Sequence, residues 1–427
     1  MQTIVIMHAL IVCWSYKQKE QRMDKLFHKH LFCGLLLLGH VFTQSKSTFK
    51  LGVENITQAF ITNVCPDTKE KCAIGLITNQ TGVDQNGKST ADVLAEKGMT
   101  IKYIFAPEHG LNGTLAERDV HDSIDEKRSI PIISLYGNGT GKMIAPEYLN
   151  AIDCLVFDIQ DSGMRHYTYI STLLSTMKVA AENNKPFVVL DRPNPLGSMM
   201  EGPLVEPELI SFISIASIPL RHGMTIGELA GYFNKYVLQK PAALQVVTMQ
   251  DYDRTQGFMG KFIHQLSPNL QSLQSCYGYS FLGLLGEIEP FDVGVGTPMA
   301  FQCITLPKKM HVSSAVWQRL QTLLSSFGVK SHFYRHTNPK HNRRSKGLRL
   351  EFSDMSNVHA FELFIAVLQF FKKEGISFSF SAAFNKAVGT KEVQEVIAGT
   401  MSKELFLKNV DKEVLQFRER AAPFYLY

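Results

Sequence analysis

Short apolar runs alternate with polar turns along the chain from about residue 73 to residue 190. The runs are rich in β-branched and aliphatic side chains, and each ends in a turn containing Gly, Pro, Asn or Asp. Helical patterns follow, notably over 171–183 and over 226–236, where Thr225 and Glu228 match a capping box. This alternation predicts an α/β fold, a parallel sheet with helices on both faces. The predicted strands are residues 73–78, 101–106, 131–136, 154–159 and 187–190.

Polar and charged side chains follow the predicted strands closely. In a parallel sheet the carboxyl ends of neighbouring strands meet at one edge, and ligands bind outside that edge. Loops are often polar only because they contact water, but here several strands bring an acid, an amide or a basic group to the same edge. We therefore expect a shared site there. Its first members are Asn79, Glu108, His109, Asp158, Asp161, Asp191 and Arg192.

These residue types favour the cleavage of a glycosidic bond. One carboxylic acid can protonate the leaving oxygen while a second carboxylate attacks or stabilises the anomeric carbon. Arginines suit a substrate that carries a carboxylate, because a guanidinium fork matches that group. Structural interpretations compete: Asp191 can cap the Pro-rich turn after it, whereas Glu108 lies in a turn that needs no carboxylate for its structure. The same edge also offers Arg165, Tyr167, Tyr169, Asn194, Glu201, Arg221 and His222.

Charge and motifs exclude several functions. The chain has 427 residues, with 44 Lys and Arg against 39 Asp and Glu. Residues 1–45 hold five of the basic and two of the acidic residues, so the remainder is close to neutral and is not expected to bind nucleic acid. The sequence has no Gly-x-Gly-x-x-Gly, no Gly-x-Ser-x-Gly and no His-Glu-x-x-His. We therefore expect no cofactor; a metal held by His109, His222 and an Asp is the weaker alternative.

Residues 1–45 are interpreted as a targeting segment that is not part of the fold. They contain two apolar runs, 4–14 and 31–42, each about half of the ~20 residues that a membrane span needs. Lys25 and Lys29 before the second run are typical of a signal peptide. We expect an exported protein that is periplasmic or associated with the cell envelope. The alternative is an uncleaved N-terminal anchor, through which alone we expect a link to a membrane. In an oxidising compartment Cys65 and Cys72 can pair, although both also fit as small buried residues.

Seven segments match one known family in order and spacing. They are GLITNQTGVD, APEHGLNG, SLYG, VFDIQDSGMRHYTYI, VVLDRPNPLG, MEGPLVEPE and PLRHGMTIGELAGYFN. On these motifs, residues 50–427 resemble the exo-β-N-acetylmuramidase family (NamZ, formerly YbbC-like). The resemblance implies an exo-acting glycoside hydrolase that releases N-acetylmuramic acid from the non-reducing ends of peptidoglycan fragments, with muramyl sugars or muropeptides as partners. It implies a Rossmann-like domain over 46–240, a smaller α+β domain over 241–427, and an active-site cleft between them.

The family's motifs also imply roles for individual residues. Glu108 becomes the catalytic acid and Asp161 the second carboxylate, with Glu201 as a rival for the second role. The family often has an arginine where this chain has Val295, which leaves room for a non-catalytic envelope protein that binds glycan on the same fold. Residues 333–347 form a basic run, expected to be a solvated loop or a rim that attracts anionic glycan. The residues implied to shape the sugar pocket are Asn79, His109, Asp158, Arg165, Tyr169, Asp191, Arg192, Asn194, Glu201, Arg221 and His222.

Overall fold

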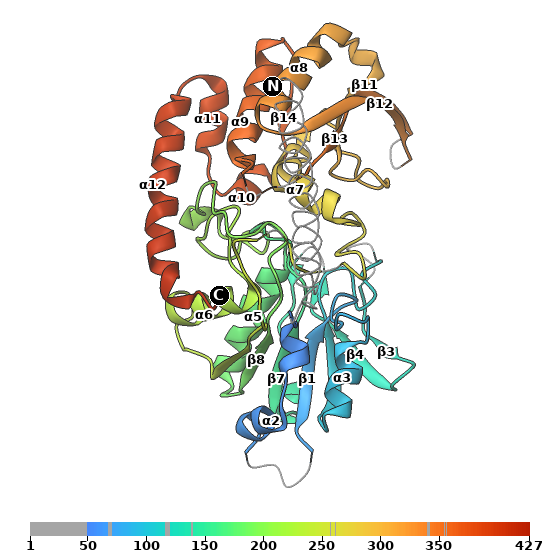
Figure 1. The fold of residues 1–427 in the computed structure, drawn as a ribbon, viewed down its shortest axis with the longest axis vertical. Helices are drawn as coiled ribbons and strands as arrows, with labels where there is room; N and C mark the ends of the chain where they lie inside the picture. The colour runs from blue at the N-terminus through green and yellow to red at the C-terminus, as the bar shows by residue number, and fades with distance from the viewer. Residues whose placement is uncertain are drawn as a thin grey trace, which may run out of the picture. The chain divides into compact units, whose positions relative to one another are not determined.

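A computed structural model describes residues 49–66, 71–115, 120–137, 140–256, 258–260, 262–339, 342–353, 355 and 357–427 (Figure 1). The segment over which a signal peptide or anchor is expected, residues 1–45, lies outside this part of the chain. Residues Phe49–Tyr427 are joined by contacts into one unit. Within the described ranges, no helix combines the length and the apolarity needed to cross a bilayer.

A seven-stranded sheet lies at the centre of the first part of this unit. Its strands are in the order β3-β4-β2-β1-β7-β8-β9, and every neighbouring pair is parallel except β3 with β4. The predicted parallel sheet is therefore confirmed. It extends past the domain boundary expected at residue 240, because β9 pairs with β8. The bounds are β1 Ala73–Thr78, β2 Thr100–Ala106, β3 Ser123–Asp125, β4 Ile130–Ser134, β7 Cys154–Asp158, β8 Phe187–Leu190 and β9 Leu244–Val247.

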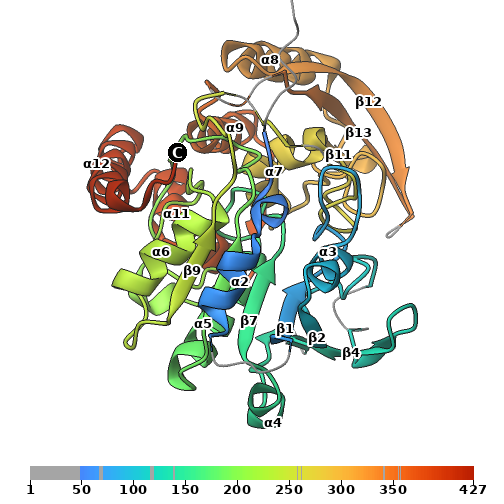
Figure 2. The same ribbon diagram turned by 60° about the horizontal axis from the view of Figure 1, so that its bottom comes forward.

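Helices cover both faces of this sheet, as expected (Figure 2). Successive strand residues point to opposite faces, so Ile74 and Leu76 of β1 join one apolar cluster while Ile77 joins the other. Burial on both faces explains why the strands are continuous apolar runs. The expected capping box is present, since the Thr225 hydroxyl accepts the N–H of Glu228. The covering helices are α2 (Gln58–Val64) and α3 (Thr90–Glu96) on one face, and α5 (Tyr169–Glu182) and α6 (Ile226–Tyr236) on the other.

The second part of the unit is a smaller α+β arrangement, as the resemblance implies. Its main sheet has three antiparallel strands in the order β11-β13-β12. Residues 333–347, expected to be a solvated loop or a rim that attracts anionic glycan, lie mostly in the β12–β13 hairpin, where nine residue pairs hold the two strands together. The expectation of a loop is therefore wrong, and the rim stays a prediction. The main elements are α7 Leu273–Leu285, β11 Cys303–Pro307, α8 Ser314–Ser326, β12 Lys330–Asn338, β13 Arg343–Glu351, α9 Ala360–Lys373, α10 Phe384–Val388, α11 Glu392–Ala398 and α12 Lys403–Ala421. Short elements complete the unit: α4 Pro146–Asn150, the pair β5 Tyr136–Gly137 and β6 Thr140–Gly141, and the pair β10 Ile288–Glu289 and β14 Ser379–Phe380.

The cysteines of the unit divide into one pair and three single thiols. Cys65 and Cys72 form a disulfide that joins the end of α2 to the start of β1. Cys154, Cys276 and Cys303 are buried and unpaired with one another. The structure thus decides between the two interpretations left open for Cys65 and Cys72: they pair.

Candidate active site

A cavity of about 720 Å³ is lined by residues from both parts of the unit. Small-ligand sites commonly measure about 300–1,000 Å³, so the cavity has the size of a binding site. The first part supplies the loop after β2 and residues 166–169, at the start of α5. The second part supplies residues of α7, residues 286–295 and the β12–β13 hairpin. The cavity therefore occupies the position of the expected cleft.

Glu108 reaches this cavity from a tight turn at the carboxyl end of β2. His109 and Gly110 both adopt left-handed backbone conformations, with φ of 70° and 73°, and a non-glycine residue is uncommon in that region. The Nδ1 atom of His109 lies 3.0 Å from the carbonyl oxygen of Leu115, which fixes the turn. Glu108 is only 7% exposed and accepts a hydrogen bond from the hydroxyl of Thr168. The structure thus holds the predicted catalytic acid in one orientation on the cavity wall.

Tyrosine rings form much of the wall next to Glu108. Tyr167 and Tyr169 pack edge to face with their centroids 4.7 Å apart. The Tyr169 hydroxyl donates to the backbone carbonyl of Glu108 at 3.4 Å, and the Tyr167 hydroxyl donates to that of Leu266 at 2.9 Å. Burial raises the pKa of Tyr167, Tyr169 and Tyr279 above the usual value, so these hydroxyls stay neutral near pH 7. Apolar rings that carry neutral hydroxyls suit a sugar, which is itself part apolar and part hydrogen-bonding.

His166 also lines the cavity and is a residue that the sequence reasoning missed. Its ring stacks on Tyr279 with the centroids 4.6 Å apart, and a Cβ atom at Gly283 of α7 would lie only 2.6 Å from its Nε2 atom. Neither ring nitrogen has a hydrogen-bond partner among the described residues. Burial, together with the positive charge of Arg165, lowers the pKa of His166 to about 3. The cavity wall therefore holds a neutral imidazole whose donor and acceptor nitrogens are buried without a partner among the described residues.

The second part of the unit also brings acids to the cavity. Glu287 accepts a hydrogen bond from the hydroxyl of Ser381 at 2.7 Å. Burial raises the pKa of Tyr279, and the negative charges of Glu108 and Glu287 raise it further, so both acids act on the same ring. Both parts of the unit therefore contribute carboxylates to the cavity lining, and glycoside hydrolysis uses a pair of carboxylates. The acids from the second part are Glu287, Glu289 and Asp292.

Asp161, the predicted second carboxylate, lies behind the cavity wall and is 4% exposed. Its Oδ2 atom accepts the N–H of Gly163 at 2.7 Å and lies 3.0 Å from Nε2 of His222. Because Nδ1 of His222 accepts the N–H of Met224, the ring proton is on Nε2 and is donated to Asp161. The Oδ1 atom of Asp161 has no partner within the described part of the chain. The structure brings Asp161 and His222 together, and their role in the reaction stays a prediction.

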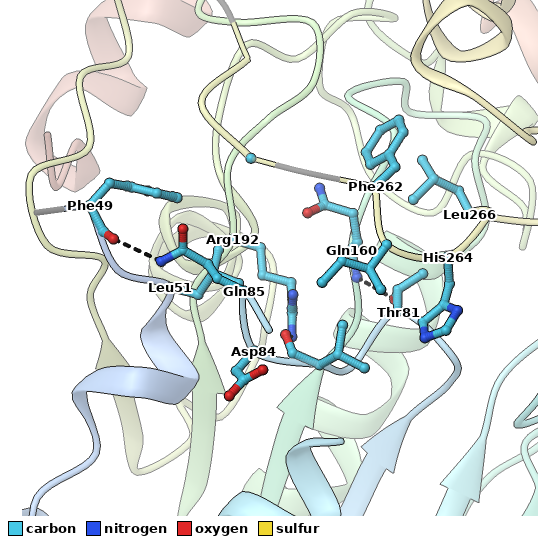
Figure 3. Close-up of a pocket in the computed structure, with 13 residues that line it drawn as sticks. Phe49, Leu51, Thr81, Asp84, Gln85, Gln160, Arg192, Phe262, His264 and Leu266 are labelled. Carbon is cyan, nitrogen blue, oxygen red and sulfur yellow. Dashed lines mark hydrogen bonds between the residues drawn. The ribbon is translucent and has the colours of Figure 1, made fainter. Parts of the chain in front are cut away.

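Asp158 and Arg192 form a buried ion pair at the carboxyl ends of β7 and β8. Arg192 Nη2 donates to Oδ2 of Asp158 at 2.8 Å and to the carbonyl of Val83 at 2.9 Å, and the Thr90 hydroxyl also donates to Asp158. Arg192 borders a second cavity of only about 30 Å³, which has room for about one water molecule (Figure 3). This small cavity lies where the strand order reverses, the usual ligand position in such a sheet. Residues 262–266 help to close it, so the larger cavity lies instead beside the loop after β2.

Asp191 caps the start of α6. Its Oδ1 atom accepts the N–H of Gly227 at 2.8 Å, and its Oδ2 atom accepts the hydroxyls of Thr225 and Tyr427, each at 2.8 Å. Burial raises the pKa of Asp191 to about 7, although the bond from Gly227 opposes that rise. The carboxylate thus has a structural role at the turn, close to the capping interpretation. Two predicted amides also bond to nearby backbone: Asn79 accepts the N–H of Thr81, and Asn194 accepts that of Leu196.

Arg165 connects the sheet part to the second part of the unit. It is completely buried, and its Nη1 atom donates to the carbonyls of Pro203 at 2.6 Å and Ile218 at 2.7 Å. Its Nη2 atom donates to the carbonyl of Val388, at the end of α10, at 2.7 Å. A Cβ atom at Gly389 would lie 2.5 Å from Nη2, so this backbone lies directly against the guanidinium. Arg165 is not part of the cavity lining.

Arg221 and Glu201 make a similar connection to α9. Arg221 Nη1 lies 3.1 Å from Oε1 of Glu201, and Arg221 Nη2 donates to the carbonyl of Met355 at 3.0 Å. Glu201 accepts the N–H groups of Ala360 and Phe361, the first two residues of α9. A carboxylate at a helix N-terminus satisfies free N–H groups and complements the helix dipole. Both side chains therefore hold the two parts together, and neither is part of the cavity lining.

The predicted site residues thus form two layers. Glu108, His109 and Tyr169 lie on the cavity wall. The others lie behind it and fix the loops that carry the wall; for these, substrate binding stays a prediction. The sequence did contain signals for the missed residues: His166 lies inside the family segment VFDIQDSGMRHYTYI, and Glu287 lies in the stretch 285–302, just before the glycines of its loop.

These observations define a two-part α/β protein with a carboxylate-bearing cavity between a parallel sheet and a smaller α+β part. The chain belongs to the exo-β-N-acetylmuramidase NamZ family, because the models of the family's N-terminal and C-terminal domains match residues 74–274 and 277–427. The resemblance seen in the sequence motifs is therefore confirmed. A relative from Bacillus subtilis (strain 168), peptidoglycan β-N-acetylmuramidase NamZ, is 34% identical over 410 residues, which cover 92% of this chain and 98% of the relative.

Two crystal structures of DUF1343 family proteins from Bacteroides fragilis NCTC 9343 share the fold. One has a TM-score of 0.78 and 32% identity, and the match covers 90% of this chain and 100% of that chain. The other has a TM-score of 0.71 and 25% identity, with 89% and 99% covered. Both parts of the unit are thus present in solved relatives of nearly the same length.

Proposed function

We propose that this chain is an exo-acting β-N-acetylmuramidase that releases N-acetylmuramic acid from the non-reducing ends of peptidoglycan fragments. The observation that carries the proposal is Glu108: a buried carboxyl group held by Thr168 on the wall of a sugar-sized cavity that further acids also line. Membership of the NamZ family and the name of the Bacillus subtilis relative support the substrate class.

In this proposal Glu108 is the general acid that protonates the leaving oxygen of the glycosidic bond. The hydroxyl of Thr168 donates to its Oε2 atom and orients the carboxyl group. Glu287 is our choice for the second carboxylate, because it lines the same cavity and, of the acids from the second part, it is the one that acts with Glu108 on the Tyr279 ring. Asp161 and Glu201, the two residues that the sequence motifs suggest for this role, are bound behind the wall by His222 and by Arg221.

Two chromogenic glycosides test the proposed function. The para-nitrophenyl β-glycosides of N-acetylmuramic acid and of N-acetylglucosamine differ only in the lactyl ether, so their hydrolysis rates measure specificity directly. We expect release of nitrophenol from the muramic compound and little from the other. Binding of both sugars without hydrolysis would refute the enzyme and support the alternative, a non-catalytic envelope protein that binds glycan or muropeptide.

Variants of the carboxylates test the roles. Glu108→Gln is expected to reduce kcat by about 10²–10⁴-fold, the usual contribution of a general acid, while sugar binding stays measurable. Glu287→Gln should also reduce kcat strongly, and the exposed Glu208→Gln, away from the cavity, is the matched control. If Asp161→Asn loses all turnover while Glu287→Gln turns over normally, and the two variants are equally stable, the role of second carboxylate returns to Asp161. Normal turnover of Glu108→Gln would remove the acid role.

We further propose that the protein is exported to the periplasm or cell envelope. The disulfide between Cys65 and Cys72 supports this, because disulfides persist in oxidising compartments. Cell fractionation followed by N-terminal sequencing tests it, and we expect a mature chain that begins near residues 43–46, after the second apolar run. An uncut, membrane-bound chain would favour the anchor, and recovery from the cytosol alone would contradict export.

A further inference from the structure

The cavity has many acids but little positive charge. Carboxylates from both parts of the unit line it, whereas the arginines expected to face a substrate carboxylate are bound elsewhere: Arg165 and Arg221 by backbone carbonyls, and Arg192 by Asp158. Among the described residues that line the cavity, Arg343 is the only arginine or lysine. An anionic substrate would be repelled by the acids unless a cation pairs with its charge, so the position of Arg343 matters.

The hairpin fixes Arg343 at the cavity. Arg343 begins β13 and lies directly opposite Asn338, the last residue of β12. Directly opposed residues project from the same face of a sheet. Asn338 is 2% exposed, and its Nδ2 atom donates to Oδ1 of Asp292 at 3.2 Å and to the carbonyl of Val295 at 3.3 Å. Because Asp292 and Val295 also line the cavity, Asn338 anchors the hairpin with its neighbour Arg343 at the cavity rim.

Arg343 is available to bind a ligand. It is exposed, and it makes no ion pair or side-chain hydrogen bond within the described part of the chain. Asp292, the acid that contacts the strand neighbour of Arg343, is already bound by that neighbour, Asn338, by the N–H of Gly294 at 2.9 Å and by the ring of His336 at 3.2 Å. A guanidinium fork with no internal partner, beside a cavity with acids, is suited to a carboxylate on the ligand.

We propose that Arg343 binds the lactyl carboxylate of the muramic acid residue and so distinguishes it from N-acetylglucosamine. This inference rests on the proposed function, because it names the group on the substrate that this part of the cavity recognises. Arg343 is a specificity residue here and takes no part in proton transfer. Because Arg343 is exposed, we expect its loss to weaken the affinity for the muramic sugar about tenfold, which is the low end for a charged hydrogen bond.

Equilibrium binding in the Glu108→Gln background tests this separately from catalysis. Titration calorimetry with N-acetylmuramic acid and with N-acetylglucosamine compares ligands that differ only in the lactyl group. Adding Arg343→Gln should weaken binding of the muramic sugar about tenfold and leave the other unchanged. The matched control is Arg344→Gln, which removes the same charge from the next residue; Arg344 is exposed, pairs with Thr337 and does not line the cavity.

Two results would overturn the inference: equal weakening for both sugars, or no weakening for either. A rescue adds a second test, since Val295→Arg combined with Arg343→Gln places a guanidinium on the neighbouring wall position and should restore part of the preference. A failure of the wild-type protein to hydrolyse the muramic glycoside would count against the proposed function only. The binding comparison would still decide whether Arg343 recognises the carboxylate.

Discussion

Replacing Arg165 by methionine is expected to destabilise the fold without weakening sugar binding. The guanidinium is completely buried and donates to the carbonyls of Pro203, Ile218 and Val388 at 2.6, 2.7 and 2.7 Å. Methionine fills much of the same volume but has no donor, so three buried carbonyls lose their partner. Each such loss costs about 1–3 kcal/mol, and rearrangement recovers a part. We therefore expect the free energy of unfolding to fall by about 3–5 kcal/mol.

Urea denaturation followed by tryptophan fluorescence and circular dichroism measures this change. KM for the muramic glycoside is measured on the folded fraction and should stay within about twofold of wild type, because Arg165 is not part of the cavity lining. Arg335→Met is the matched control, since Arg335 is exposed on β12 and should change the free energy of unfolding by less than about 0.5 kcal/mol. A normal free energy of unfolding together with a raised KM would show that Arg165 reaches the substrate, and would refute the structural role.

Two more predictions concern stability. The pKa of His166 in the folded protein, about 3, lies below the ordinary 6.5, so the unfolded chain binds the proton first as the pH falls. The stability that this group contributes is thus complete above about pH 7.5 and is lost as the pH falls. Between pH 7.5 and pH 5 the free energy of unfolding of wild type should fall by about 2 kcal/mol more than that of His166→Gln. Equal losses for the two proteins in urea titrations would contradict the buried, neutral ring. The paired change Cys65→Ser with Cys72→Ser should cost about 2–3 kcal/mol, because the disulfide closes a loop with a sequence separation of 7. Dithiothreitol should lower the melting temperature of wild type only, and a similar drop in the double variant would exclude the disulfide as the cause.

Much of the sheet could be predicted because its strands are buried on both faces. The runs at 73–78, 154–159 and 187–190 coincide with β1, β7 and β8 to within one residue. The hairpin strands β12 and β13 were missed for the opposite reason: exposed residues such as Arg335 and Arg344 interrupt the apolar pattern, and the segment resembles a solvated loop. The last strand of the sheet, β9, is short and only partly buried, which hid it as well.

The site could be predicted only where a side chain lacked a structural alternative. Glu108 was found because a carboxylate in its turn has no local bonding role. Arg165 and Arg221 have the same residue type as a substrate-binding arginine, but several of their partners are backbone carbonyls more than a hundred residues away along the chain, such as those of Val388 and Met355. No local pattern reports such partners, so only the structure separates these residues from the cavity wall.

The contact between His166 and α7 has a consequence for the width of the binding site. Gly283 has no side chain, and a methyl group there would overlap the imidazole, since its carbon would lie 2.6 Å from Nε2. The ring, which lines the cavity, would have to shift to make room. The absence of a side chain at Gly283 therefore keeps the imidazole in its place in the wall, and we expect one added carbon there to reduce the space for a bulky substituent on a bound sugar.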